Sequence, residues 1–115
     1  LWRNPQHDVE QLLGHRLEQD EAEVVKLVIA YSAGISFPIK DAEYRKAIRD
    51  MSPLQYKEVI ESAAKMVQSK PILALYKTGK LSEKVVKALV QTMKESVKNL
   101  QEYIDQKAMQ YDLEH

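Results

Sequence analysis

The chain has 115 residues, of which 44% are hydrophobic and 30% are charged, and its 17 basic and 17 acidic side chains leave no formal net charge. This length and composition predict one folded domain rather than a disordered chain, and the charge balance excludes attraction of a polyanion by the field of the whole molecule. The absence of cysteine excludes disulfides and thiolate metal sites, and it favours an intracellular, cytoplasmic origin.

The two ends of the chain carry signs of processing. It begins with Leu1 rather than methionine, so we expect a fragment, and Leu113-Glu114-His115 resembles the remnant of a vector-encoded tag. We therefore expect a single helical domain over residues 1–112. The run from Leu27 to Ile39 has 13 residues and is interrupted by a glycine and a proline. A membrane-spanning helix needs about 20 apolar residues, so no membrane span is predicted.

A first helix is predicted from about Gln6 to Gln19, where apolar residues recur at the helical period. Gly14 lies inside this range and costs a helix about 1 kcal/mol relative to alanine. We nevertheless expect the helix to continue through it.

A second helix is predicted over about residues 20–34. Asp20 and Glu23 have the spacing of a capping box at its start, and Gly34 supplies the left-handed position that commonly ends a helix. From Val24 to Ala33 its residues are apolar around almost the whole circumference, apart from Lys26. Because such a helix is normally buried on every side, we expect it to lie at the centre of the fold, wrapped by the others.

Three shorter elements are predicted in the middle of the chain. The first runs from about Asp41 to Met51. The next begins at Ser52-Pro53, because serine caps a helix and proline is tolerated at its first position, and continues to about Ser69. Pro71 then opens one or two helical turns, which Gly79 ends.

Ser82 is predicted to cap a last helix over about residues 82–111. Its apolar side chains form one wide stripe, which is typical of a helix that faces a core. The stripe consists of Val86, Leu89, Val90, Met93, Val97, Leu100, Tyr103, Ile104 and Tyr111. A helix of 30 residues is about 45 Å long. That exceeds the diameter of a compact domain of this size, whose radius of gyration is about 13 Å. We therefore expect an all-α bundle of about five helices, from which the last helix projects beyond about Leu100.

Catalytic and metal-binding motifs are poorly represented. Ser62-Ala63-Ala64-Lys65 and Lys77-Thr78-Gly79 match two of the three motifs of serine β-lactamases and penicillin-binding proteins, but the middle motif is missing. His7 and His15 lack the glutamate three residues earlier that di-iron bundles use, and the carboxylates between Glu18 and Glu23 lack the glycine and the spacing of a calcium loop. No phosphate-binding loop is present. We expect no catalytic residue, no metal and no cofactor.

Lysines are concentrated in the second half of the chain, with eight between residues 65 and 98 against two glutamates. Four of them, at intervals of three, seven and four, lie on one face of the last helix, opposite its apolar stripe. The candidate polyanion-binding residues are Lys80, Lys84, Lys87, Lys94 and Lys98. Lysine binds phosphate as a point charge, so these side chains could hold a nucleic-acid backbone without reading its sequence. A merely solvated helix face has the same pattern, and both interpretations stay open.

The end of the last helix is a second candidate surface. The predicted protein interface consists of Leu100, Tyr103, Ile104 and Tyr111. Tyrosine is enriched in the cores of interfaces, and an apolar surface that projects into water commonly meets a partner. The partner would be another protein or a second copy of the chain. Alternatively, these side chains fold over the shorter helices, or the end of the helix frays.

Three functional hypotheses follow from the sequence. The leading one is a non-enzymatic helical interaction module, such as an adaptor or a small subunit of a larger assembly, which binds through the last helix. The second is a helical subunit that binds nucleic acid or another polyanion through its lysines. The third is an enzyme whose site is completed by another chain.

Overall fold

The computed structural model describes residues 4–114, apart from the side chains of Tyr76 and Glu114. Over this range the chain forms six α-helices and no strand, so the predicted all-α class is confirmed. Their bounds are α1 Pro5–Leu13, α2 Gln19–Ser32, α3 Asp41–Asp50, α4 Pro53–Val67, α5 Lys70–Lys77 and α6 Glu83–Glu114. Residues 1–3 of the expected domain and His115 of the expected tag remnant lie outside the described range.

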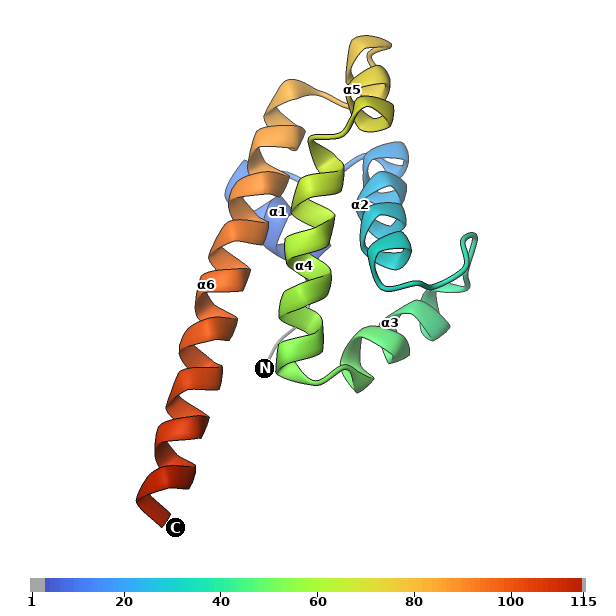
Figure 1. Cartoon of the computed structure of the whole chain (residues 1–115). Coiled ribbons are helices and arrows are strands. Elements are labelled where there is room, and N and C mark those ends of the chain that lie inside the picture. The colour runs from blue at the N-terminus through green and yellow to red at the C-terminus, as the bar shows by residue number, and fades with distance from the viewer. Residues whose placement is uncertain (1–3, 115) are drawn as a thin grey trace.

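The helices pack around α4. In Figure 1, α6 runs along one side of α4 and α2 lies on the other, while α1 lies behind and contacts α6 and α2. α5 sits at one end of this group and α3 at the opposite end (Figure 1). Aliphatic side chains fill the interior, and the largest fully buried ones include Ile29, Ile60, Leu81, Leu89 and Met93.

The end of α1 differs from the prediction. The helix stops at Leu13 instead of Gln19, because Gly14 takes the left-handed conformation at φ 80° and its N–H donates to Glu10 O at 2.9 Å. The carboxylate of Glu10 then accepts a hydrogen bond from the N–H of Leu17 at 2.8 Å. This bond holds the connection after α1 in place, and Leu17 reaches the core from it.

The start of α2 also differs from the prediction. The helix begins at Gln19, and Glu18 is its N-cap residue. The N–H of Glu18 donates to Glu21 Oε1 at 3.3 Å, so the capping pair lies two residues before the expected Asp20 and Glu23. The chain turns into the helix directly after Leu17, because that side chain is already anchored in the core.

α2 is buried along one side rather than wrapped on every side. Val25, Val28 and Ile29 lie in the core, whereas 68% of Tyr31 is exposed. The reason is the central place of α4, which separates α2 from α6 and leaves the far side of α2 without a neighbouring helix (Figure 1). Its predicted end is confirmed, since Gly34 has φ 73° and Ile35 N–H donates to Ala30 O at 2.9 Å.

Local capping signals set three further boundaries as predicted. Ser52 Oγ accepts a hydrogen bond from Gln55 N–H at 3.1 Å at the start of α4, with Pro53 at the first helical position. Ser82 Oγ accepts one from Val85 N–H at 3.3 Å at the start of α6. Gly79, at φ 79°, follows α5.

The last helix spans the molecule. Its 32 residues correspond to about 48 Å, and the longest extent of the chain is 55 Å against 26 Å in the other two directions. The lower part of α6 in Figure 1 extends past all the other helices, as the sequence predicts. Among the described helices, none combines the length and apolar character that crossing a membrane requires.

Candidate functional site

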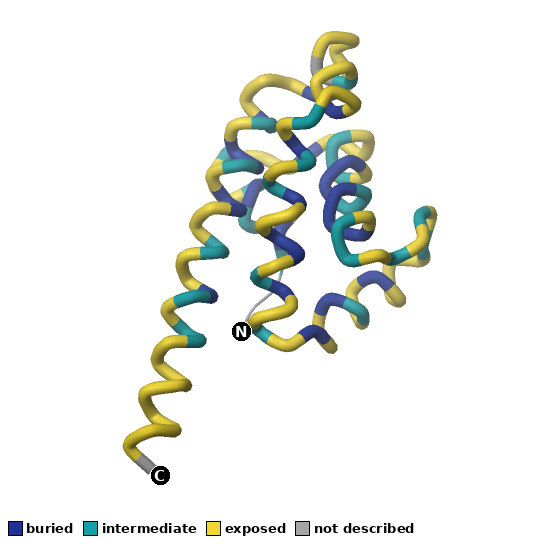
Figure 2. The backbone as a smooth tube through the Cα atoms, in the orientation of Figure 1, coloured by how far each residue is buried: buried dark blue, intermediate teal, exposed yellow. Residues whose placement is uncertain are grey.

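The stretch of α6 from residue 101 to residue 114, here called the projecting end, follows the last buried side chain of the helix. Along α6 the buried side chains stop at Leu100. Figure 2 shows the change, from mixed burial along the upper helix to continuous exposure along its final turns. Fourteen residues of helix, about 21 Å, therefore follow Leu100, and the described side chains from Asp105 onward are all exposed.

The four predicted interface residues fall into three environments. Leu100 is only 3% exposed and belongs to the core of the bundle, which corrects its assignment to a partner surface. Tyr103 and Ile104 are half-buried at the margin of the bundle. Tyr111 is 63% exposed. The bundle thus ends just beyond the predicted limit, and the candidate surface consists of Tyr103, Ile104 and Tyr111.

These three side chains share one side of the helix. Their spacing continues the stripe that carries Met93 and Leu100 in the core, so the core-facing side of α6 runs on past the bundle. Lys107 lies on the same side, with Nζ 5.6 Å from the centroid of the Tyr103 ring. The sequence hypothesis did not include this lysine.

The described side chains on the rest of the projecting end are three acidic ones and several uncharged ones. Glu102, Asp105 and Asp112 are exposed, and Asp105 Oδ1 accepts a hydrogen bond from Gln101 Nε2 at 2.8 Å. Met109 is 65% exposed and lies on roughly the opposite side from Tyr111, because the two are separated by 200° of helical rotation. The projecting end therefore has an aromatic side that includes one lysine, and its described acidic side chains lie on the other sides of the helix.

The five predicted polyanion-binding lysines are all exposed. Lys87 Nζ lies 3.1 Å from Glu83 Oε1, and both side chains are well exposed. Ion pairs of this kind contribute a few tenths of a kcal/mol and leave the lysine accessible. Lys80 lies in the turn before α6, and the other four follow the outer face of the helix.

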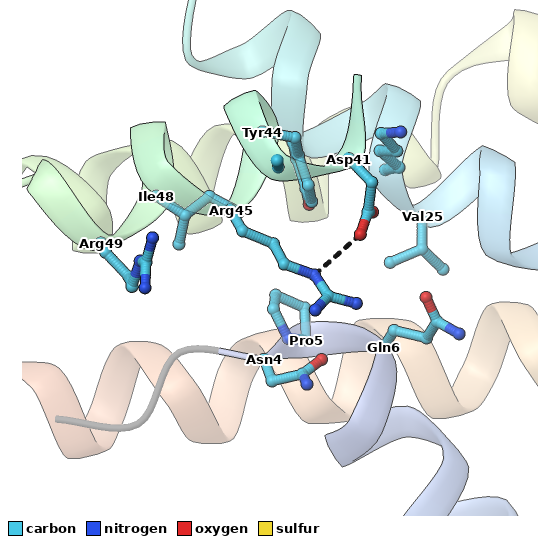
Figure 3. A pocket seen from close by; sticks show the side chains of 11 residues that line it. Asn4, Pro5, Gln6, Val25, Asp41, Tyr44, Arg45, Ile48 and Arg49 are labelled. Atoms are coloured by element: carbon cyan, nitrogen blue, oxygen red, sulfur yellow. Dashed lines mark ion pairs between the residues drawn. The ribbon is translucent and has the colours of Figure 1, made fainter. Parts of the chain in front are cut away.

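A third feature, which the sequence hypotheses missed, is a groove between α1, α2 and α3, here called the α1–α3 groove. It has a volume of about 560 Å³. Figure 3 shows α3 on one side and the start of α1 on the other, with the Arg45 side chain reaching across. Its lining comprises Asn4, Pro5, Gln6, Val25, Lys26, Asp41, Ala42, Tyr44, Arg45, Ile48 and Arg49.

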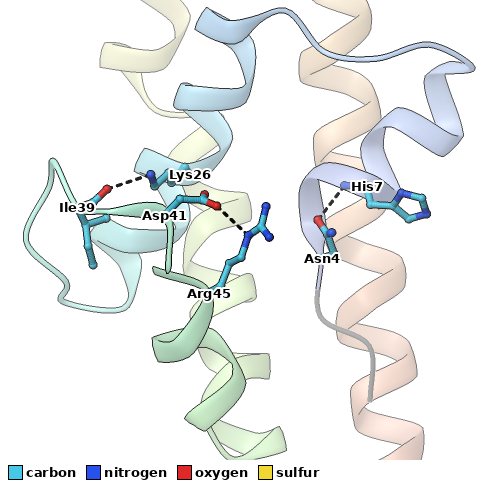
Figure 4. Close-up of polar contacts among 6 residues, drawn as sticks. All are labelled: Asn4, His7, Lys26, Ile39, Asp41 and Arg45. Atoms are coloured by element: carbon cyan, nitrogen blue, oxygen red, sulfur yellow. Dashed lines mark hydrogen bonds and ion pairs between the residues drawn. The ribbon is translucent and has the colours of Figure 1, made fainter. Parts of the chain in front are cut away.

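The groove has an apolar floor and a basic rim. Val25, Tyr44 and Ile48 are buried, whereas Arg45 and Arg49 are exposed one helical turn apart on α3. Arg45 Nε lies 2.9 Å from Asp41 Oδ2, an ion pair within the first turns of α3 (Figure 4). The sequence signal for this rim was the spacing of the two arginines in an otherwise short helix.

Lys26 explains how one charge is accommodated in the apolar helix α2. Its Nζ donates to Ile39 O at 3.0 Å and lies 5.6 Å from the centroid of the Tyr44 ring, which ties the loop before α3 to α2 (Figure 4). The Tyr44 hydroxyl lies in a largely dehydrated environment. Burial, followed by the neighbouring Tyr56 and Asp41, raises the pKa of Tyr44 well above its ordinary value.

The residues of the two acyl-transfer motif matches have ordinary helical roles. Ser62 and Lys65 are exposed on α4. Thr78 Oγ1 donates to Leu75 O at 3.0 Å, at the end of α5. Within the described residues, no three histidine or carboxylate side chains are grouped so that they could hold a metal ion.

Comparison with known proteins adds no further information: no family model matches the sequence, and neither the curated proteins nor the solved structures contain a significant match.

Proposed function

We propose that this protein is a non-enzymatic helical interaction module, an adaptor or a small subunit of a larger assembly, which binds a protein partner through the projecting end of α6. The observation that carries this proposal is the continuation of the core-facing side of α6 beyond the bundle, at Tyr103, Ile104 and Tyr111. A partner would cover this side as the bundle covers Met93 and Leu100.

Two physical arguments support the proposal. Isolated helices shorter than about 12 to 15 residues are marginal in water, so a projecting helix gains order when a second surface packs against it. Aromatic side chains with few rotatable bonds also bury a large area at a low cost in conformational entropy, and they are enriched at the centres of interfaces.

The test compares a double variant, Tyr103→Ala with Ile104→Ala, with a control variant, Met109→Ala, on another side of the same helix. Sedimentation velocity over a range of concentrations reports self-association. Affinity capture from source cells, repeated with the purified captured protein, reports binding to another partner. We expect the double variant to weaken binding at least about ten-fold and the control to bind as the wild type does.

The thermal unfolding midpoint is measured for both variants. If the double variant simply unfolds, Tyr103 and Ile104 serve the core of the bundle, and the proposal is wrong. Unchanged binding of a folded double variant to every partner of the wild type would also contradict it.

A second candidate function is binding of a nucleic-acid backbone or another polyanion through Lys80, Lys84, Lys87, Lys94 and Lys98. The observation that favours it is the exposure of all five side chains over adjoining turns of the chain. Contacts with phosphate depend on charge rather than base identity, so binding would be non-specific and would weaken as salt rises.

Fluorescence anisotropy of labelled single- and double-stranded oligonucleotides tests this candidate at several salt concentrations. A steep loss of affinity with salt, together with loss of binding when Lys84, Lys87, Lys94 and Lys98 are changed to glutamine, would support it. No binding at low salt would leave these lysines as a solvated helix face.

A further inference from the structure

The end of the molecule opposite the projecting end is formed by α5 and the turn that follows it (Figure 1). α5 packs mainly against α4. On its inner side Ile72 is buried in the core, and Leu75 is half-buried against that core. Residues 70–84, which comprise α5, the turn and the start of α6, are here called the α5 tip.

The outer side of α5 combines lysine with exposed apolar surface. Four exposed side chains lie within about 100° of one another around the helix: Lys70, Leu73, Ala74 and Lys77. Leu73 keeps 41% of its surface in solvent although it is a large aliphatic residue. The buried side of α5 lies opposite, so the exposure of Leu73 follows from the direction in which the helix packs.

The α5 tip is also positively charged. The sequence has no acidic residue between Glu61 and Glu83. Glu83 Oε1 lies 3.1 Å from the Nζ of Lys87, a lysine outside the tip. The tip itself carries four exposed lysines against this one glutamate, which leaves it at +3: Lys70, Lys77, Lys80 and Lys84.

This combination of charge and apolar surface matches the boundary of a lipid bilayer. An anionic leaflet attracts lysines through its headgroups, and the region beneath the headgroups accepts an apolar side chain. Nucleic acid also attracts lysines, but its phosphate backbone offers an exposed leucine no favourable contact. The position of Leu73 between Lys70 and Lys77 therefore favours a membrane surface over a nucleic acid.

We propose that the α5 tip docks on the surface of an anionic lipid bilayer. The lysines of the tip contact the headgroups, and Leu73 reaches the boundary between the headgroups and the acyl chains. Such docking requires no membrane-spanning helix, and none of the described helices could span a membrane. It is also independent of the proposed function, because the projecting end lies at the other end of the molecule and stays available to a protein partner (Figure 1).

Two weak attractions act together in this contact. A lysine close to an anionic membrane surface raises the affinity about five-fold. A single apolar anchor gives only marginal binding, and a basic patch beside it makes the attachment stable. Four lysines and one leucine therefore give reversible binding that rises with the share of anionic lipid and falls as salt increases.

Sedimentation with vesicles tests the proposal. The full chain is mixed with vesicles of phosphatidylcholine and phosphatidylserine, or of phosphatidylcholine alone, and the bound fraction is measured against lipid concentration at several salt concentrations. We expect binding only to the vesicles that contain phosphatidylserine, and we expect salt to weaken it. A wild type that binds neither kind of vesicle at low salt, or both kinds alike, would overturn the proposal.

A matched pair of lysine variants locates the contact. Lys70→Gln with Lys77→Gln removes two charges from the tip. Lys94→Gln with Lys98→Gln removes two exposed charges from α6, about 15 Å or more beyond Lys84 and thus further than the Debye length of about 10 Å. We expect the tip variant to weaken binding at least about ten-fold and the α6 variant less than about two-fold. Equal weakening by the two variants would overturn docking through the tip.

The contribution of Leu73 is measured separately from that of the charges. Leu73→Ala should weaken binding about three-fold, because part of the apolar contact is lost. The control is Leu54→Ala at the start of α4, since Leu54 is 51% exposed and lies outside the tip. It should bind as the wild type does. Unchanged affinity of a folded Leu73→Ala variant would overturn insertion of the leucine.

A labelled variant keeps this step testable if Leu73→Ala loses helix content in circular dichroism. The chain has no cysteine, so Leu73→Cys can carry a single environment-sensitive dye. We expect brominated lipid to quench the dye at position 73 but not on a Lys98→Cys control. An unquenched dye at position 73 in vesicle-bound protein would overturn insertion of the tip.

Two further measurements distinguish this proposal from the functions proposed above. Binding to oligonucleotides without binding to vesicles would overturn it and support the second candidate function. The double variant Tyr103→Ala with Ile104→Ala should bind vesicles as the wild type does, and loss of vesicle binding by this folded variant would overturn docking through the α5 tip. Vesicle binding and protein capture can thus fail separately.

Discussion

The two parts of α6 are one continuous helix with different surroundings. From Glu83 to Leu100 the inner side is packed against α4 and α1, and Leu89, Met93 and Leu100 are buried. From residue 101 to residue 114 the same side carries Tyr103 and Ile104, which are half-buried, and then Tyr111, which is exposed. The comparison teaches that the helical period determines which side faces inward, whereas the position of neighbouring helices determines whether that side is covered.

The largest expected effect on stability comes from a substitution in the covered part of α6, between Glu83 and Leu100. Leu89→Ala removes a fully buried side chain and leaves a cavity that the surrounding helices fill only in part. The free energy of unfolding should fall by about 3 kcal/mol, within the usual range of about 2 to 5. Chemical denaturation would measure this loss, and the slope of the free energy of unfolding against denaturant concentration should stay unchanged. A loss below about 1 kcal/mol would contradict tight packing of this part.

The buried side chain of Tyr44 makes the stability of the fold depend on pH. The pKa of Tyr44 is raised in the folded state, whereas an unfolded tyrosine ionises near pH 10. Below pH 10 the hydroxyl is neutral in both states and stability is unaffected. Above pH 10 the unfolded chain releases the proton first, so stability falls by at most about 1.4 kcal/mol per pH unit.

Tyr44→Phe isolates this contribution. Wild type and variant are denatured at pH 9, 10 and 11, and the difference between their free energies of unfolding is followed. We expect the variant to lose less stability than the wild type as pH rises. Parallel losses would show that the Tyr44 hydroxyl is not held in a dehydrated position.

A smaller effect is expected at the start of the covered part. Ser82 Oγ accepts a hydrogen bond from the N–H of Val85, and Ser82→Ala leaves that donor without its cap. Such a change costs about 1 kcal/mol. The reduction should appear in denaturation curves, and Ser82→Asp, which can also cap, should restore most of it. If alanine and aspartate behaved alike, the hydrogen bond would contribute nothing to α6.

Local chemistry explains which parts of this fold the sequence could predict. The capping serines at 52 and 82 and the glycines at 34 and 79 act through their own backbone neighbourhood, so the boundaries near them follow from the sequence. Gly14 has the same chemistry, but the apolar residues on both sides of it favoured a continuous helix. The helix nevertheless ends at Gly14, and the hydrogen bond from Leu17 N–H to Glu10, seven residues away, holds the connection that follows.

The candidate site also has features that follow from the local sequence and features that depend on distant parts of the chain. The projecting end was predictable, because helix length and domain diameter both follow from the chain itself. Burial of Leu100 and exposure of Tyr31 were not, since both depend on where other helices end. The α1–α3 groove required tertiary structure altogether: it is formed by residues 4–6, Val25 and Lys26, and α3, which are distant in the sequence.

The smallest expected effect on stability comes from a truncation of the uncovered part of α6. The same truncation should abolish binding, so it distinguishes stability from association. Removing residues 106–115 keeps Tyr103 and Ile104 at the margin of the bundle but takes away Tyr111 and the last turns of α6. Because exposed positions contribute little, the free energy of unfolding should change by less than about 0.5 kcal/mol, while binding through the projecting end is lost. The contrasting control is Leu100→Ala, which should cost at least about 2 kcal/mol although it removes only part of one side chain.

Denaturation and sedimentation velocity on both variants would measure the two effects, the loss of stability and the loss of binding. If the truncation cost more than about 1 kcal/mol, the projecting end would be packing against its own bundle, and the difference between the two parts of α6 would disappear.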